Sequence, residues 1–199
     1  MIIAGITGGI GSGKTSFCKI WEDEGVEVIY LDDFAKELMV SDQELIKQIK
    51  NTFGDESYYP DGTLNRKYLA AEAFEKGRVS ELNALVHPAL WKKLDQMITE
   101  KREQGLPLLA IEAAILLNKG RPDRVDSVIL IESDRDEQIQ RVKKRDGISE
   151  EKEILSRLNK QPDFSNLHHL ADHVIYNNGS LEELQQKALK LLDQLTETD

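Results

Sequence analysis

Five short apolar runs alternate with longer segments of helical pattern along the chain. Strands of a parallel sheet that is covered on both faces have this near-continuous apolar character, and helices usually connect them. The pattern predicts an α/β fold with about five parallel strands flanked by helices. The runs are rich in Val, Ile or Leu and too short for free-standing helices: Ile2–Ile6, Val26–Leu31, Leu108–Ile111, Val128–Ile131 and Val174–Tyr176.

Two amphipathic helices are predicted at the two ends of the chain. The first begins near Lys14 and carries Phe17, Ile20 and Trp21 on one face. The second spans Leu181–Leu195, with leucines and an alanine at helical spacing. Because an apolar stripe of this kind faces a core, we expect both helices to pack against the sheet.

The remaining helical segments form two excursions from the core. About seventy residues without a convincing strand separate the second and third runs, which is too long for one crossover and predicts a helical insertion over residues 33–104. Its helices are expected at Asp42–Asn51, Arg66–Lys76 and Pro88–Glu103. A second, charged excursion at residues 135–160 lacks a strong apolar stripe and is expected to project from the core. The core itself is then made of residues 1–32, 105–134 and 161–199.

Composition is that of an ordinary globular protein, with 199 residues, 40% hydrophobic and 31% charged. The net charge of −10 disfavours binding to nucleic acid or to an anionic membrane over the whole surface, so an anion site must be local. One cysteine, Cys18, excludes an intramolecular disulfide and a cysteine-rich zinc site. The chain shows no signal-peptide pattern and no apolar run of membrane-spanning length, so a cytoplasmic location without membrane association is expected. No obligate protein partner is evident from the sequence.

The strongest functional signal is a glycine-rich loop between the first run and the first helix. Residues 8–15, which we call the phosphate loop, fit the pattern G-x-x-x-x-G-K-[ST]. Such a loop turns successive backbone N–H groups toward phosphate oxygens, and the helix dipole adds partial positive charge. Lys14 is predicted to bridge the β- and γ-phosphates of ATP, and Thr15 to place its hydroxyl on Mg²⁺. The predicted ATP contacts are Gly9, Ile10, Gly11, Ser12, Gly13, Lys14 and Thr15.

Other residues favour a kinase over a GTPase. A GTPase usually carries D-x-x-G and N-K-x-D motifs. The sequence has no D-x-x-G, and both of its Asn-Lys pairs, at residues 118–121 and 159–162, lack the final Asp. The phosphate loop is therefore expected to serve phosphoryl transfer or ATP binding.

Acidic residues follow two of the predicted strands, where the carboxyl ends of a parallel sheet meet the ligand crevice. Asp32 could accept a proton from an attacking hydroxyl and hold Mg²⁺ through water, or it could only cap the next helix. We assign the functional role to Asp32 and the cap to Asp33. Glu112 ends an apolar run like a Walker B acid and could contact the Mg²⁺ shell or a substrate group, or begin a helix.

Arginines concentrate in the charged excursion. Arg141 and Arg145 are four residues apart and would lie on one helical face, where they could reach the same phosphate. The alternative is a solvated helix with internal ion pairs such as Glu137 with Arg141. The first interpretation makes the excursion an arm that shields the reaction from water.

Motifs over nearly the whole chain resemble one family, the dephospho-coenzyme A kinases. Beyond the phosphate loop, the similarity lies in Phe53-Gly54, Asp61-Gly62-Thr63-Leu64-Asn65-Arg66, Leu85-Val86-His87-Pro88, Gln138 with Arg141 and Arg145, Arg157 with Gln161, and Ala171 to Gly179 with its Asn177-Asn178-Gly179. A generic nucleotide kinase would not be expected to carry these motifs in this order.

The resemblance implies transfer of the ATP γ-phosphate to the ribose 3′-hydroxyl of dephospho-coenzyme A, the last step of coenzyme A synthesis, with ATP and Mg²⁺ as cofactors. It also implies a nucleoside-monophosphate-kinase-like core. Residues 33–104 would receive dephospho-coenzyme A, with Arg66 and His87 in the substrate site, and residues 135–160 would be the lid. By the same resemblance Asp32 is the base and a metal-shell residue, Arg141 and Arg145 close on the phosphates, and Asn177 lies beside the adenine of ATP.

Two departures from the family pattern bear on these roles. Members often have Asp-Ala-Asp after the second strand, whereas this chain has Tyr30-Leu31-Asp32, so Asp32 stands without the first acid. After the third strand, many members show Pro-Leu-Leu followed by Glu, whereas here Glu112 is followed by two alanines. Two other functions remain open: a kinase of the same architecture with another nucleoside or nucleotide acceptor, such as an adenylate-kinase-like protein, and an ATP-binding regulatory module without phosphotransfer.

Overall fold

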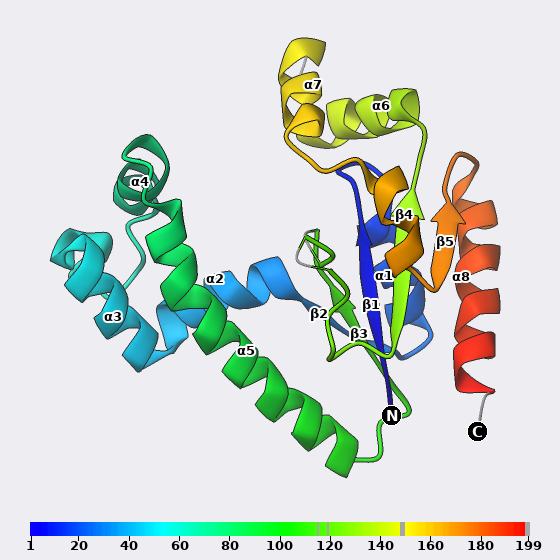
Figure 1. Ribbon diagram of the computed structural model, residues 1–199, viewed down its shortest axis with the longest axis horizontal. Helices are drawn as coiled ribbons and strands as arrows, with labels where there is room; N and C mark the ends of the chain where they lie inside the picture. The colour runs from blue at the N-terminus through cyan, green and yellow to red at the C-terminus, as the bar shows by residue number, and fades with distance from the viewer. Residues whose placement is uncertain (115, 119, 148–149, 198–199) are drawn as a thin grey trace. The chain divides into compact units, whose positions relative to one another are not determined.

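The computed structural model describes residues 1–114, 116–118, 120–147 and 150–197. It divides into two compact units, Met1–Tyr30 with Gly105–Asp199, and Leu31–Gln104. Figure 1 shows the elements of each. The first unit contains β1 (Ile2–Gly8), α1 (Lys14–Asp23), β2 (Glu27–Tyr30), β3 (Leu108–Glu112), β4 (Ser127–Glu132), α6 (Arg135–Asp146), α7 (Glu151–Asn159), the 3₁₀ helix η3 (Phe164–Leu170), β5 (His173–Tyr176) and α8 (Leu181–Thr196).

A five-stranded sheet forms the centre of the first unit. Its order is β2-β3-β1-β4-β5, and every neighbouring pair is parallel. The register sets Ile6 of β1 opposite Glu112 of β3, and Glu112 opposite Tyr30 of β2. The ends of three adjacent strands therefore meet at one edge of the sheet, as a ligand crevice requires. The predicted α/β fold with five parallel strands is confirmed.

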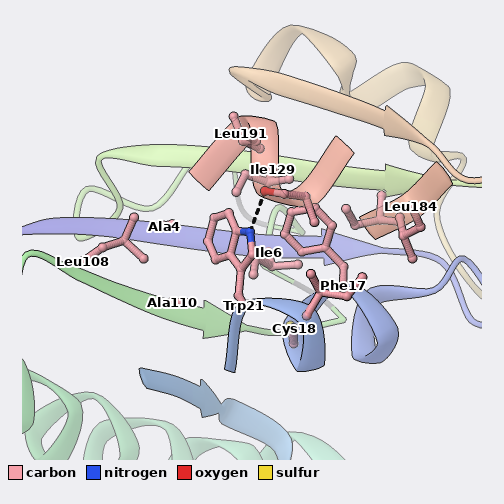
Figure 2. Packing of buried hydrophobic residues seen from close by; sticks show 13 residues of the cluster. Ala4, Ile6, Phe17, Cys18, Trp21, Leu108, Ala110, Ile129, Leu184 and Leu191 are labelled. Carbon is pink, nitrogen blue, oxygen red and sulfur yellow. Dashed lines mark hydrogen bonds between the residues drawn. The ribbon is translucent and has the colours of Figure 1, made fainter. Parts of the chain in front are cut away.

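The apolar core of this unit lies between the sheet and two helices, α1 and α8. Phe17 and Trp21 of α1 are fully buried with Ala188 of α8, and Figure 2 shows their packing against β1. The Trp21 indole N–H donates to the Ala188 carbonyl at 2.9 Å, so its polar atom is satisfied inside the core. Cys18 is buried in the same cluster, and burial, the largest cause, raises the pKa of its thiol well above the usual range. Both helices pack as their sequence patterns predicted.

The second unit, Leu31–Gln104, is helical, apart from one isolated antiparallel bridge between Tyr58 and Leu64. Tyr58 is buried there and donates to the Met39 carbonyl at 2.7 Å, and burial raises the pKa of its phenol to about 12. The elements are α2 (Leu31–Ser41), α3 (Gln43–Phe53), the 3₁₀ turn η1 (Asp55–Ser57), α4 (Arg66–Ala70), the π turn η2 (Ala71–Glu75) and α5 (Val79–Glu103).

Helix α5 begins nine residues before the start expected from Pro88. It runs over Val79–Glu103 with Pro88 inside it, so the expectation that Pro88 opens the helix is wrong. Proline removes one backbone hydrogen bond there. The buried stripe of Val86, Leu90, Leu94 and Ile98 continues across the proline at a spacing of four, and this packing outweighs the lost bond.

The charged excursion folds as α6 and α7, with residues 148 and 149 of its range outside the described part of the chain. It has a small core of its own in which Ile139, Val142 and Ile154 are buried. Ile10 of the phosphate loop packs against this cluster. The two helices are therefore held next to the loop by apolar contact.

None of the helices in the described ranges is long and apolar enough to cross a bilayer.

Candidate active site

The phosphate loop connects β1 to α1 through glycines with positive φ. Gly11 has φ 75° and Gly13, the residue before α1, has φ 103°. Only glycine adopts these angles readily. A Cβ on Gly13 would also overlap the side-chain amide of Asn177. The glycines therefore serve both the turn and the close approach of a neighbouring side chain.

Lys14 folds back over the loop. Its Nζ donates to the carbonyls of Gly8 at 2.8 Å and Gly9 at 3.1 Å, and it lies 3.9 Å from Oε1 of Glu112. Both charged side chains are 11% exposed. The ammonium group therefore lies inside the concave loop, where a phosphate could exchange for the carbonyls.

Glu112 is the last residue of β3 and is buried. The alternative that it begins a helix is wrong, because its backbone belongs to the sheet between β1 and β2. Its carboxylate faces Lys14 at the edge where the strands end. Glu112 therefore resembles a Walker B acid in its position, at the end of a buried strand and next to the lysine of the phosphate loop.

Ser12 is the residue on which contacts from distant parts of the chain converge. Its carbonyl accepts from Nδ2 of Asn177 at 2.8 Å and from the Arg141 guanidinium at 3.5 Å. The Ser12 hydroxyl oxygen is buried and has no hydrogen-bond partner among the described residues. A buried, unpartnered polar atom in such a loop fits a site that gains a partner when phosphate binds.

Gln161 also contacts the loop, and spacing gave no reason to expect it there. Its Oε1 accepts from the Ile10 N–H at 2.8 Å, across 151 positions of sequence. The family resemblance includes Gln161 but assigns it no role. Only the tertiary fold brings this amide to the loop.

The two arginines predicted to share a phosphate have different partners. Arg141 is half-buried and contacts Ser12, the Ser133 hydroxyl at 3.2 Å and Glu137 at 3.4 Å. Arg145 is exposed and pairs with Asp146 at 2.7 Å. This hydrogen bond is the largest cause that lowers the pKa of the Asp146 carboxyl. Arg141 is placed at the loop, whereas Arg145 is engaged by its neighbour.

The other predicted site residues belong to the helical unit. Asp32 is exposed in the first turn of α2, two residues after β2 ends. Arg66 is the exposed first residue of α4, and His87 is partly buried in α5. Asp33 is not a helix cap, because α2 already begins at Leu31, and it pairs with Lys36 at 2.6 Å instead.

A magnesium ion would be held by oxygen donors, and the residues present supply them. Thr15 is exposed in the first turn of α1, directly after Lys14. Within the described ranges, no group of three or more His, Cys, Asp and Glu side chains gathers as a ready-made metal site. Mg²⁺ generally keeps several waters and uses few protein ligands beside substrate phosphates, and the Thr15 hydroxyl is an oxygen donor of the kind that it binds.

Comparison with known proteins assigns this arrangement to a family. A family model described as dephospho-CoA kinase matches residues 2–183. A dephospho-CoA kinase of Salinibacter ruber is 37% identical over 192 residues, covering 96% of each chain. This chain belongs to the dephospho-CoA kinase family. The resemblance found in its motifs is confirmed.

Solved structures of similar proteins agree with the fold. A protein from Thermus thermophilus is 31% identical, with a TM-score of 0.79 and 98% of each chain covered. The dephospho-CoA kinase of Campylobacter jejuni, at 21% identity and a TM-score of 0.68, covers 98% of this chain and 97% of its own and supports the fold alone. This chain thus shares its fold with both proteins.

Proposed function

We propose that this chain transfers the γ-phosphoryl group of ATP to the ribose 3′-hydroxyl of dephospho-coenzyme A, the last step of coenzyme A synthesis in the cytoplasm. The observation that carries the proposal is a complete phosphate loop in a chain that matches the dephospho-CoA kinase family over residues 2–183. Phosphoryl transfer needs positioned donors around developing charge more than covalent chemistry by the protein. The loop, Lys14 and Arg141 supply such donors.

The phosphate loop holds the triphosphate in this mechanism. Backbone N–H groups bind its oxygens, and Lys14 leaves the carbonyls of Gly8 and Gly9 to bridge the β- and γ-phosphates. Mg²⁺, held by Thr15 and through water by Asp32, would neutralise part of the phosphate charge when bound. Glu112 stays beside Lys14 and contributes to the shell around the substrate or the metal.

The attacking hydroxyl is activated by Asp32. Its carboxylate accepts the proton of the 3′-hydroxyl as the oxygen bonds to the γ-phosphorus and the bond to the ADP oxygen breaks. Arg66 and His87 bind dephospho-coenzyme A in the helical insertion, residues 33–104. Arg141 and the lid of residues 135–160 close on the phosphates and exclude water, whereas Arg145 stays paired with Asp146.

The first experiment is an ADP-release assay with ATP and Mg²⁺ that compares dephospho-coenzyme A, AMP, adenosine and no acceptor. Turnover with dephospho-coenzyme A alone is the expected result. Turnover with AMP or adenosine instead would keep a kinase of this architecture and reject the substrate. ATP binding without turnover on any acceptor would favour a regulatory module.

A further inference from the structure

Two side-chain amides from the C-terminal part of the chain hold the backbone of the phosphate loop. Gln161 accepts from the Ile10 N–H, and Asn177 donates to the Ser12 carbonyl, each at 2.8 Å. The partners are 151 and 165 positions apart, so these bonds depend on the folded core. They lie on either side of Gly11, where the loop turns.

Each bond fixes the direction of one peptide unit. A trans peptide is planar, so its carbonyl and N–H point in opposite directions. Holding the Ser12 carbonyl on Asn177 therefore sets the direction of the Gly13 N–H, and holding the Ile10 N–H sets that of the Gly9 carbonyl. A flipped peptide at Ser12 would present a carbonyl to a phosphate where the loop needs an N–H group.

Asn177 is itself firmly placed. Its backbone N–H donates to the Glu132 carbonyl at the end of β4 at 2.7 Å, and the residue is 6% exposed. Its amide lies against Gly13, where a Cβ would collide with it. Gln161 is anchored less deeply, by its N–H bond to the Leu158 carbonyl of α7 at 3.1 Å.

We propose that Asn177 and Gln161 are positioning residues that hold the phosphate loop in the conformation that receives polyphosphate. Asn177 acts through the Ser12 carbonyl and not through the adenine of ATP, the contact that the family resemblance implies. This inference rests on the proposed function only in requiring that the loop binds ATP.

Inorganic tripolyphosphate tests the proposal because it has no base. Calorimetry would give the dissociation constants of ATP and tripolyphosphate for the wild type, Asn177→Ala and Gln161→Met. Loss of one loop-orienting bond is expected to weaken both ligands by about tenfold, or about 1.4 kcal/mol. The KM for ATP should rise in parallel, while the KM for dephospho-coenzyme A stays within about twofold.

Asn178→Ala is the matched control, since the Asn178 side chain accepts from the Asp134 N–H and is exposed. Its affinity for tripolyphosphate should not change. If Asn177→Ala weakens ATP but not tripolyphosphate, the side chain contacts the base and the proposal is overturned. Unchanged affinity for both ligands would overturn it as well.

Gln161→Met decides the question if Asn177→Ala does not fold, because its bond is only part-buried. Unchanged tripolyphosphate affinity in that variant would then overturn the proposal, and a loss of about tenfold would support it. The readout is independent of the acceptor. A wild type that binds tripolyphosphate but does not phosphorylate dephospho-coenzyme A would refute the proposed function and leave this test intact.

Discussion

Lys14 is the residue to which the proposed function assigns the β- and γ-phosphates. In the structure its ammonium is bonded to two loop carbonyls and faces Glu112. The lysine ammonium is a point charge on a flexible side chain, so it can move from the carbonyls to a phosphate without rearrangement of the backbone. The resting contacts thus keep a partly buried charge satisfied until ATP arrives.

Lys14→Ala is expected to lower kcat/KM by about 10²- to 10³-fold, because it removes a cation aimed at developing phosphate charge. The assay is ADP release at saturating dephospho-coenzyme A. Thermal unfolding of the variant, compared with wild type, controls for loss of structure. An unchanged kcat/KM would reject the role of Lys14.

Asp32 lacks the first acid of the Asp-Ala-Asp pattern described above, since Tyr30 takes that position. A variant of Asp32 separates an effect on catalysis from an effect on ATP binding. Asp32→Asn keeps the shape but cannot take a proton, so turnover is expected to fall by about 10²- to 10⁴-fold. ATP affinity, measured by calorimetry, should change by less than about threefold. Asp33→Asn is the neighbouring control. Equal turnover in Asp32→Asn and wild type would contradict the assignment of the base.

Helices α6 and α7 carry the arginine cluster, and their contacts divide it. Arg141 lies on the loop side with Ser12 and Ser133. Arg157 joins Arg145 on Asp146, at 3.1 Å, and also pairs with Glu153 at 2.7 Å. Exposed pairs of this kind contribute little to stability. They connect the end of α6 to α7, whereas Arg141 contacts Ser12 of the loop.

The variants Arg141→Ala and Arg145→Ala test whether these two arginines differ in function as they differ in their contacts. Arg141→Ala is expected to lower kcat by about 10²-fold, with a smaller loss of ATP affinity, because a guanidinium that stabilises developing charge acts mainly in the transition state. Arg145→Ala should change kcat by less than about threefold. Steady-state kinetics gives kcat, and calorimetry gives the dissociation constant of ATP. Similar losses in both variants would show that Arg145 also reaches the phosphates.

The sequence was informative about elements wherever pattern and local chemistry agreed. The strands, α1, α8 and the phosphate loop follow from apolar runs and a fixed glycine spacing. Proline misled the prediction of α5, because its local cost is outweighed by a buried stripe that only tertiary packing satisfies. Asp33 was assigned as a cap because propensity does not locate the first helical residue. The Gln161 and Asn177 contacts with the loop could not be predicted, since no local signal connects positions so far apart.

At the scale of the molecule, the chain carries a net charge of −10, whereas the proposed substrate ATP is itself a polyanion. In the proposed function, attraction of the nucleotide comes from the loop N–H groups, Lys14 and Arg141, because the net charge of the chain opposes the approach of a polyanion. Individual carboxylates that are paired with cations make the stability depend on pH. Arg121 pairs with Asp172, and this hydrogen bond is the largest cause that lowers the pKa of that carboxyl. The Val128 N–H also donates to Asp172, at 2.7 Å.

The chain is expected to lose stability as the pH falls through the acidic range. A carboxyl with a lowered pKa in the folded state binds fewer protons there than in the unfolded state, so its stabilising effect is complete above the unfolded pKa of about 4. It disappears as the pH falls toward the folded pKa. The midpoint of thermal unfolding, measured by circular dichroism from neutral pH to pH of about 3, should decline below about pH 4. Asp172→Asn should show a shallower decline, and an identical one would contradict the role of this pair.

The burial of Cys18 has a practical consequence for experiments that follow movement of helices α6 and α7. Thiolates attack electrophilic reagents such as maleimides, and a buried thiol with a raised pKa presents almost no thiolate at neutral pH. The native protein is therefore expected to react slowly with maleimides. A cysteine introduced on the exposed face of α6 would take a fluorescent label at that one position, and opening or closing of the α6–α7 arm could be observed without first removing Cys18 from the core.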